Sequence, residues 1–278
     1  MKNETYNWNV GGVEQFAQSW RADAPKATIA LVHGMGEHSG RYAHHFAPFF
    51  TERGFDILAF DHLGHGQTTG KRGHCPGGYD AVLDTVDHLY DQARSLFGAD
   101  RPLFVYGHSM GGNVVLNHAL RRTPQIAGVV ASAPMLQLAF EPPKWKMALG
   151  KKMIRIMPSF TENTGLDSVA ISRDPDEVEA YENDPLVHSK ISAAFSIPFF
   201  EAGEWAIDHA GDSTIDTLVL HGTGDQLTSA EGTKAFARNG NEHVSIQLFD
   251  GLYHELHHEP EHEEVLTIVA DWMDERIA

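Results

Sequence analysis

The chain has 278 residues, of which 42% are hydrophobic and 10% aromatic, so it is long and apolar enough to bury one large core. Its 21 Lys and Arg residues against 38 Asp and Glu residues give a formal net charge of −17, which repels phosphate backbones and excludes nucleic acid as an expected partner. A single cysteine, Cys75, excludes an intrachain disulfide framework. The sequence has no secretory signal pattern and no apolar run of about 20 residues, so we expect a cytoplasmic protein.

Short apolar runs alternate with segments of helical period along most of the chain. Residues 6–20 predict an antiparallel hairpin around Gly11-Gly12. Apolar residues recur at steps of three and four over 79–97, which predicts a helix with one face on a sheet. The strand candidates are 28–32, 55–60, 103–106, 126–132, 217–220 and 244–249. This alternation is typical of an α/β fold with a mostly parallel central sheet flanked by helices.

The alternation breaks after Pro134. From there to about residue 216 the chain carries six prolines and no clear strand, which predicts a helical insertion. We therefore expect an α/β core formed by residues 1–134 and 206–278, with residues 135–205 as a helical cap or lid.

Residues 107–111 read Gly-His-Ser-Met-Gly, which is the pattern G-x-S-x-G, between a predicted strand and the helical segment 113–122. This placement is typical of a nucleophile elbow, where a serine sits on a sharp turn and glycines two positions away avoid collisions with the backbone. Ser109 is therefore the candidate nucleophile. The alternative is a glycine-rich turn with an incidental serine.

A serine nucleophile needs an imidazole base, and the imidazole needs a carboxylate to fix its tautomer. Asp225 and His254 each follow a predicted strand, and the carboxyl ends of parallel strands share one edge of the sheet. The chain order Ser109, Asp225, His254 is that of α/β-hydrolases. Asp250 is the competing carboxylate, but it lies only four residues from His254.

Acyl transfer also needs donors for the developing oxyanion, and two backbone amides suffice. Met110 follows the nucleophile at the start of a helix, where free N–H groups point outward. Met35 lies in the glycine-containing loop 33–36 after an earlier strand and is the second expected donor. The alternative for that loop is a simple glycine turn.

Several motifs together resemble the monoacylglycerol (monoglyceride) lipases of the α/β-hydrolase superfamily, from about residue 32 to 258. They are His-Gly-Met-Gly-Glu-His-Ser-Gly-Arg-Tyr at 33–42, Asp-His-Leu-Gly-His-Gly-Gln at 61–67, the elbow at 107–112, and the segments 172–175, 181–186 and 253–257. The resemblance implies a serine hydrolase that cleaves a monoacylglycerol ester to glycerol and a fatty acid through an acyl-enzyme. It implies neither a cofactor nor a catalytic metal.

In that family the residues matching Glu37, Arg41, Tyr181 and His257 lie around the glycerol-binding end. Donors and acceptors of this kind suit a triol. The alternative is that Glu37 and Arg41 form an ion pair that only stabilises their loop. Vertebrate members carry a cysteine where this chain has Thr228, so sensitivity to thiol reagents does not carry over.

Other functions remain open from the sequence. Within the ester hydrolases, a lysophospholipase or a broad short-chain carboxylesterase is the main alternative, because a Ser-His-Asp triad does not determine which headgroup the substrate carries. Residues 254–258 also satisfy H-E-x-x-H, the zinc-protease motif, but Gly251 and Pro260 leave little room for the helix that this motif needs. A non-catalytic binding protein on the same fold is the third alternative.

The predicted cap contains a basic segment with an apolar stripe. Its cations are Lys144, Lys146, Lys151, Lys152 and Arg155, and its apolar residues are Trp145, Leu149, Met153 and Ile156. A helix with this pattern favours a lipid surface. We therefore expect a lipid ester as partner and a transient contact of the cap with membranes, the alternative being an ordinary cap helix with solvated lysines.

Overall fold

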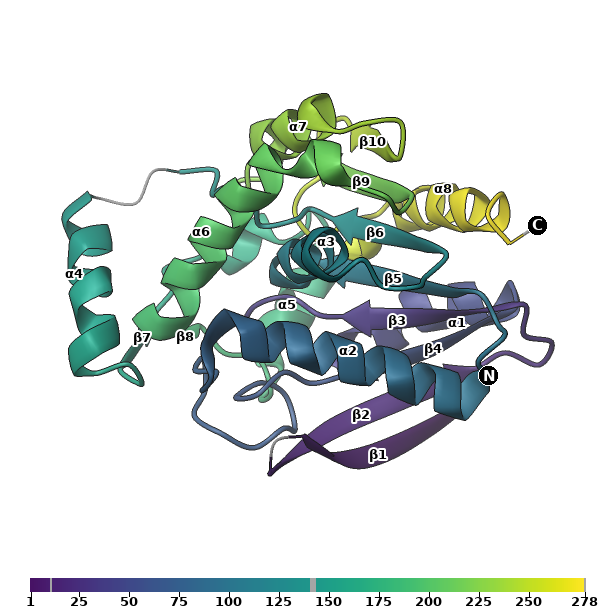
Figure 1. Ribbon diagram of the computed structural model, residues 1–278, viewed down its shortest axis with the longest axis horizontal. Helices are drawn as coiled ribbons and strands as arrows, with labels where there is room; N and C mark the ends of the chain where they lie inside the picture. Colours follow the sequence, from purple (N-terminus) through teal and green to yellow (C-terminus); the bar gives the residue numbers. More distant parts are fainter. Residues whose placement is uncertain (11, 141–143, 278) are drawn as a thin grey trace.

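An eight-stranded sheet crosses the centre of the computed structural model, which describes residues 1–10, 12–140 and 144–277 (Figure 1). Its strands are β1 (Lys2–Val10), β2 (Val13–Arg21), β3 (Ala27–Val32), β4 (Phe55–Phe60), β5 (Leu103–His108), β6 (Gly128–Ser132), β9 (Thr217–Gly222) and β10 (Val244–Phe249). The helices are α1 (Phe46–Glu52), α2 (Gly78–Phe97), α3 (Met110–Arg122), α4 (Lys144–Ile156), α5 (Pro175–Asn183), α6 (Ala193–Asp208), α7 (Ala230–Asn239) and α8 (His262–Asp274).

The strand order is β1-β2-β4-β3-β5-β6-β9-β10. β1 pairs with β2 and β2 pairs with β4 in antiparallel fashion, and every other neighbouring pair is parallel. This confirms the predicted fold class. All six predicted strands appear within two residues of their expected ends, and the opening hairpin is longer than expected. Gly11 at its turn lies outside the described residues.

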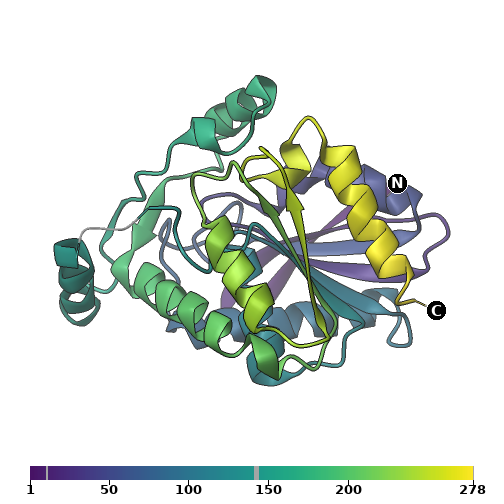
Figure 2. The same cartoon turned by 90° about the horizontal axis from the view of Figure 1, so that it is seen from above.

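Helices cover both faces of the sheet in two layers. On one face α2, α3, α6 and α7 bury apolar side chains against β3 to β6, and on the other face α1 and α8 pack against the same strands (Figure 2). The strands β3 to β6 are buried along their whole length because both of their faces are covered. α2 ends at Gly98, whose φ of 108° is readily adopted only by glycine.

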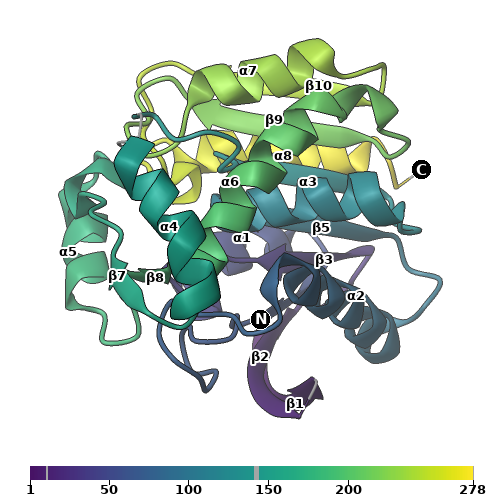
Figure 3. The same cartoon turned by 60° about the vertical axis from the view of Figure 1, so that its left-hand side comes forward.

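The chain between β6 and β9 leaves the sheet at the carboxyl ends of the parallel strands. In Figure 1 the arrowheads of β3, β5 and β6 point toward the side where α4 lies, and Figure 3 shows α4 and α5 at that end. The expectation of no strand here is wrong, because β7 (Thr161–Asn163) and β8 (Lys190–Ser192) pair in antiparallel fashion. α6 contacts α3 and α2 as well as α4, and it runs past residue 205, so the division into core and cap remains a prediction.

Within these described ranges, no helix is both long enough and apolar enough to cross a membrane.

Candidate active site

The turn from β5 into α3 places Ser109 in a strained backbone conformation. Its φ is 53° and its ψ is −114°, a combination that L-residues rarely adopt, and its N–H donates to the Ser132 carbonyl at 2.9 Å. A Cβ on Gly107 would lie 2.3 Å from the Gly111 carbonyl oxygen, and a Cβ on Gly111 would lie 2.0 Å from the Val32 oxygen. Only glycine fits at these two positions, which accounts for the spacing G-x-S-x-G.

The loops after β9 and β10 bring an aspartate and a histidine together. The two strands pair Gly222 with Phe249, so the segments that follow leave the sheet side by side. His254 Nδ1 lies 2.7 Å from Asp225 Oδ2, and the Asp225 side chain is fully buried. His254 and Ser109 line the same two cavities. Among the described residues, the carboxylate partner of His254 contacts Nδ1, and no acidic group contacts the other ring nitrogen, Nε2.

Other donors surround the Asp225 carboxylate. Two backbone N–H groups donate to Oδ1 at 2.8 and 3.0 Å, and the Thr228 hydroxyl donates to Oδ2 at 2.8 Å. His221 Nε2 lies 3.1 Å from Oδ2. His221 was not predicted as a site residue, and its only signal in the sequence is its place four residues before Asp225. The competing carboxylate, Asp250, accepts a hydrogen bond from the Thr223 hydroxyl at 3.0 Å instead.

The pKa values of the Asp225–His254 pair move in opposite directions. Burial alone would lower the pKa of His254, but the charge and hydrogen bond of Asp225 raise it above its ordinary value. Burial would raise the pKa of Asp225, but His254 and His221 hold it far below its usual range. The pair therefore stabilises an imidazolium, which is the state a base reaches when it takes a proton from a serine.

The H-E-x-x-H segment 254–258 does not form an α-helix. Only Leu256–His258 takes up a short 3₁₀ turn, η4. His254 Nδ1 faces Asp225, whereas His258 Nδ1 lies 2.7 Å from Glu255 Oε2. The two imidazoles of the motif contact different carboxylates, His254 that of Asp225 and His258 that of Glu255. The segment therefore lacks the pair of histidines on one helix face that a zinc protease needs.

Two backbone amides flank Ser109. Met110 is the first residue of α3, so its N–H has no acceptor within the helix. Met35 lies in the loop after β3, next to the elbow, since a Cβ on Gly34 would be 3.2 Å from Ser109 Cβ. In the part of the chain that the structure describes, neither the Met35 nor the Met110 amide has a hydrogen-bond acceptor.

Ser109 and His254 line an apolar cavity of about 210 Å³. Its wall comes from α6, from β8 and from the segments before α4 and after β7. The apolar side chains in that wall include Met135, Leu138, Phe140, Ile197, Phe199 and Leu227. A cavity of this composition suits a hydrocarbon chain.

A second cavity, of about 410 Å³, opens from Ser109 and His254 in another direction and is polar. Five carboxylate residues line it, namely Glu37, Asp167, Glu182, Asp184 and Glu255. Tyr181 lines it too, and burial raises the pKa of its hydroxyl, which therefore remains a neutral hydrogen-bonding group. Of the four residues expected around glycerol, Glu37 and Tyr181 thus line this cavity.

Glu37 also stabilises the loop that carries Met35. Its Oε1 accepts hydrogen bonds from the Gly34 N–H at 2.6 Å and from the Tyr42 hydroxyl at 2.9 Å. The other carboxylate oxygen, Oε2, has no hydrogen-bond partner among the described residues and lies 3.6 Å from Arg41 Nη1. Glu37 therefore both lines the polar cavity and stabilises its loop, and its contact with glycerol remains a prediction.

Arg41 pairs mainly with Glu255, which the sequence analysis considered only as part of H-E-x-x-H. Its two terminal nitrogens lie 2.5 and 2.8 Å from the Glu255 carboxylate oxygens, and its guanidinium lies over the Tyr181 ring at 4.7 Å. Burial would raise the pKa of Glu255, but Arg41 and His258 hold it well below its usual range. The buried Arg41–Glu255 ion pair therefore packs against the Tyr181 ring and supports it.

His257 lines neither cavity. It is fully buried, stacks on the Tyr42 ring at 4.7 Å, and meets the His108 ring in a T-shaped contact at 4.9 Å. Burial lowers its pKa well below the ordinary value, so the ring is neutral. The structure therefore does not bring His257 to the same surface as Glu37 and Tyr181.

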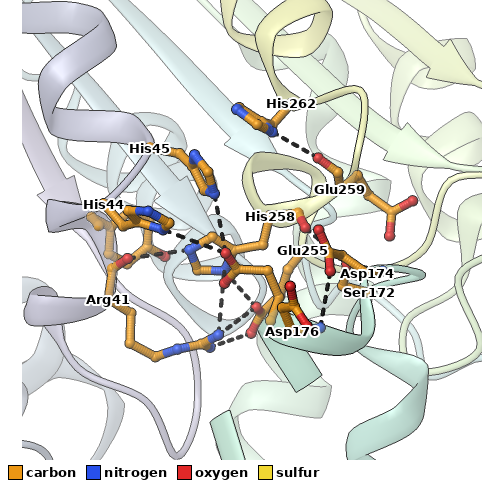
Figure 4. A network of polar contacts seen from close by, with 12 residues as sticks. Arg41, His44, His45, Ser172, Asp174, Asp176, Glu255, His258, Glu259 and His262 are labelled. Atoms are coloured by element: carbon orange, nitrogen blue, oxygen red, sulfur yellow. Dashed lines mark hydrogen bonds and ion pairs between the residues drawn. The ribbon is translucent and has the colours of Figure 1, made fainter. Parts of the chain in front are cut away.

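Among the described residues, two groups of side chains have the residue types and spacing that could bind a metal ion. In the first, Glu255, His257 and His258 are buried, and the Glu255 carboxylate is already paired with Arg41. The second consists of His44, His45 and Glu177 and lies beside this network, outside both cavities (Figure 4).

Comparisons with known proteins agree with this architecture. The family described as serine aminopeptidase S33 (Hydrolase_4) matches residues 23–261. The chain is 34% identical to the monoacylglycerol lipase of Mycolicibacterium smegmatis, covering 95% of this chain and 94% of that protein. It is 31% identical to phospholipase YtpA of Bacillus subtilis, covering 93% and 99%. The crystal structure of Paleococcus ferrophilus monoacylglycerol lipase superposes with a TM-score of 0.85 at 33% identity, covering 98% and 99%.

Proposed function

The chain belongs to the serine aminopeptidase S33 (Hydrolase_4) family and is a monoglyceride lipase-like serine hydrolase, and we propose that it cleaves monoacylglycerols to glycerol and a fatty acid. One observation carries the proposal: an apolar cavity and a polar cavity meet at Ser109 and His254. An ester with a long acyl chain on one side and a small polyol on the other fits both cavities at once.

The proposed reaction uses Ser109, His254 and Asp225. His254 takes the Ser109 hydroxyl proton at Nε2 while the serine oxygen attacks the ester carbonyl. The N–H groups of Met35 and Met110 donate to the oxygen that becomes negative. His254 then returns the proton to the leaving glycerol oxygen, and a water molecule, activated in the same way, releases the fatty acid.

The charge of the polar cavity favours a neutral headgroup. Its lining includes five carboxylates and, over the described ranges, no lysine or arginine, and the guanidinium of Arg41 is bound to one of these carboxylates, Glu255, on both terminal nitrogens. A phosphodiester would meet an excess of negative charge there, whereas glycerol hydroxyls can donate to carboxylates such as Glu37. On these grounds we place a monoacylglycerol before a lysophospholipid, although one relative is named a phospholipase.

Contact of the cap with a lipid surface is part of the proposal. On α4, the side chains of Trp145, Leu149 and Ile156 are 65%, 50% and 73% exposed, next to the cations Lys151 and Lys152. Exposed apolar side chains gathered on one helix beside cations are typical of a surface that contacts a lipid phase or a partner. α4 also borders the apolar cavity through Gly150, so an acyl chain would reach it from the same side.

A hydrolysis panel tests the proposed substrate. We expect kcat/KM for 1- and 2-monoacylglycerols to exceed that for diacylglycerols, lysophospholipids and short synthetic esters, with Ser109→Ala as the blank. Loss of the nucleophile should lower the rate by a factor on the order of 10⁶. If kcat/KM were higher for a lysophospholipid, the proposed monoacylglycerol substrate would be wrong. If Ser109→Ala kept its activity, the proposed serine mechanism would be wrong.

A further inference from the structure

A cluster of histidines surrounds the Glu177 carboxylate at the surface of the molecule. Glu177 lies in α5, whereas His44 and His45 lie between the 3₁₀ helix η1 (Ser39–Ala43) and α1. Figure 4 shows His44 and His45 on the ribbon of that early segment, with His258 and His262 from the end of the chain next to them. Segments about 130 residues apart therefore meet here.

The distances in this cluster match those between metal ligands. His44 Nδ1 and His45 Nε2 lie 3.5 and 3.1 Å from the same oxygen, Glu177 Oε1. In a tetrahedral zinc site with bonds of about 2.0–2.2 Å, ligand atoms are about 3.4 Å apart. One ligand atom from each of the three residues lies within 4.8 Å of the other two. Small side-chain rotations thus suffice to centre an ion among them.

The surroundings keep these ligands available. His45 and Glu177 are half-buried, and in the described part of the chain no lysine or arginine pairs with the Glu177 carboxylate. The ring of His262 lies 3.9 Å from that of His45, and His258 Nδ1 lies 3.9 Å from the other Glu177 oxygen. The His44 side chain is 74% exposed, which leaves a path for an ion and its water.

We propose that His44, His45 and Glu177 form a site for a divalent transition-metal ion, with Zn²⁺ as the best-suited probe. Two imidazoles and one carboxylate suit Zn²⁺, Cu²⁺ or Ni²⁺ and not Ca²⁺ or Mg²⁺, which prefer oxygen ligands. None of the three residues lines either cavity, so the ion has no place in the ester hydrolysis.

The site would join α5 to the body of the enzyme. α5 carries Tyr181, and the chain directly after it carries Asp184, both in the wall of the polar cavity. A bound ion would therefore restrict the movement of that wall relative to η1 and α1. It would also stabilise the folded state, since only the fold brings Glu177 to the two histidines.

Titration of metal-free, untagged protein tests the site. We expect one equivalent of Zn²⁺ to bind, a higher Tm, slower amide exchange in α5, and, with Co²⁺, the absorption bands of a four-coordinate ion. Glu177→Gln and His45→Gln should each weaken binding at least about tenfold and abolish the Tm rise. Ca²⁺ should have no effect.

His243→Asn is the matched control, because His243 is also a partly exposed histidine paired with a carboxylate, Asp216, at 2.8 Å. It should bind Zn²⁺ like the unchanged protein. The Tm of each variant without metal checks that it folds. Equal binding by Glu177→Gln and the unchanged protein, or no binding by either, would overturn the proposal and leave the proposed ester hydrolysis untouched.

Discussion

His221 has one tautomer that satisfies all its neighbours. Its Nε2 lies 3.1 Å from Asp225 Oδ2 and 3.3 Å from the Thr228 carbonyl oxygen, and both are acceptors. Nε2 therefore carries the hydrogen, and Nδ1 accepts from the Thr233 hydroxyl at 2.7 Å. His221 thus donates to the carboxylate that faces His254, which makes it a positioning residue for the proposed triad.

Replacing His221 with leucine should move the pH profile of activity. Without the Nε2–H donor, more of the negative charge of Asp225 acts on His254, whose pKa then rises further. Because the proposed base, His254, can accept a proton only when neutral, the acid limb of kcat/KM should move to higher pH by about one unit.

His221→Gln provides the control, because its side-chain amide can donate in place of Nε2–H. It should return the acid limb toward its original position while leaving Tm close to that of His221→Leu. If the leucine variant lost activity equally at all pH values, the role of His221 would be structural only.

At the scale of elements, the elbow depends on close contact between two strands and a helix. The Gly111 backbone approaches the end of β3 so closely that a Cβ would lie 2.0 Å from the Val32 oxygen. Gly111→Ala should therefore destabilise the protein by about 3 kcal/mol or more, as read from urea unfolding.

Gly150→Ala is the matched substitution in a helix. The nearest atom to the added Cβ would be the flexible end of the Ile197 side chain at 3.3 Å, with no backbone atom among its three nearest neighbours, and alanine is favoured over glycine in a helix by up to about 1 kcal/mol. Unfolding midpoints that agree between Gly111→Ala and Gly150→Ala would contradict the close contact at the elbow.

The charges of α4 give a second prediction at this scale. Changing Lys151, Lys152 and Arg155 to glutamate should weaken binding to anionic vesicles roughly 100-fold at low salt, at about 1 kcal/mol for each cation. The Lys151–Glu201 contact at 3.1 Å is exposed and holds the lysine only weakly. Co-sedimentation measures binding, and activity on vesicle-borne substrate should fall with it.

The same charge change made elsewhere, with Lys2, Lys234 and Arg238 turned to glutamate, should have little effect on vesicle binding. A water-soluble short-chain ester should be hydrolysed equally by all variants. If the α4 variant lost activity on both substrates alike, the helix would contribute to the active site and not to a membrane contact.

The sequence predicted the elements that carry a local pattern and missed those formed by distant partners. Buried parallel strands are continuous apolar runs, so their positions could be read directly. β7 and β8 have three residues each, too few for any periodicity, and they form only because the insertion folds back on itself. His221 lies within a strand, where its sequence context gives no sign of a contact with Asp225. Glu255 binds Arg41, which is 214 residues away, so no local pattern could indicate this pair.

At the scale of the whole molecule, the histidines set the response to acid. The sequence has 18 of them, and five share complete burial in the interior and a pKa lowered chiefly by that burial. They are His33, His62, His65, His108 and His257. The pKa of His108 is lowered to about 4. The fold therefore keeps these rings neutral at a pH where the unfolded chain would protonate them.

This difference predicts acid unfolding that begins unusually early. Below a pH of about 6.5, the pKa of histidine in an unfolded chain, these histidines bind protons in the unfolded chain and not in the folded chain. Their contribution to the folding stability is therefore fully present above a pH of about 6.5 and is lost as the pH falls toward 4. Five such rings give a loss of up to about 7 kcal/mol per pH unit, comparable with the whole stability of a domain. The raised pKa of His254 changes the folding stability only above pH 6.5, and the lowered carboxylate pKa values change it only below about pH 4.5.

Urea unfolding at pH 8, 7, 6 and 5 measures this loss of stability. The urea midpoints should fall steeply below pH 7, and His65→Gln should reduce the dependence of stability on pH by about one proton. An unchanged midpoint between pH 7 and pH 5 would contradict this account.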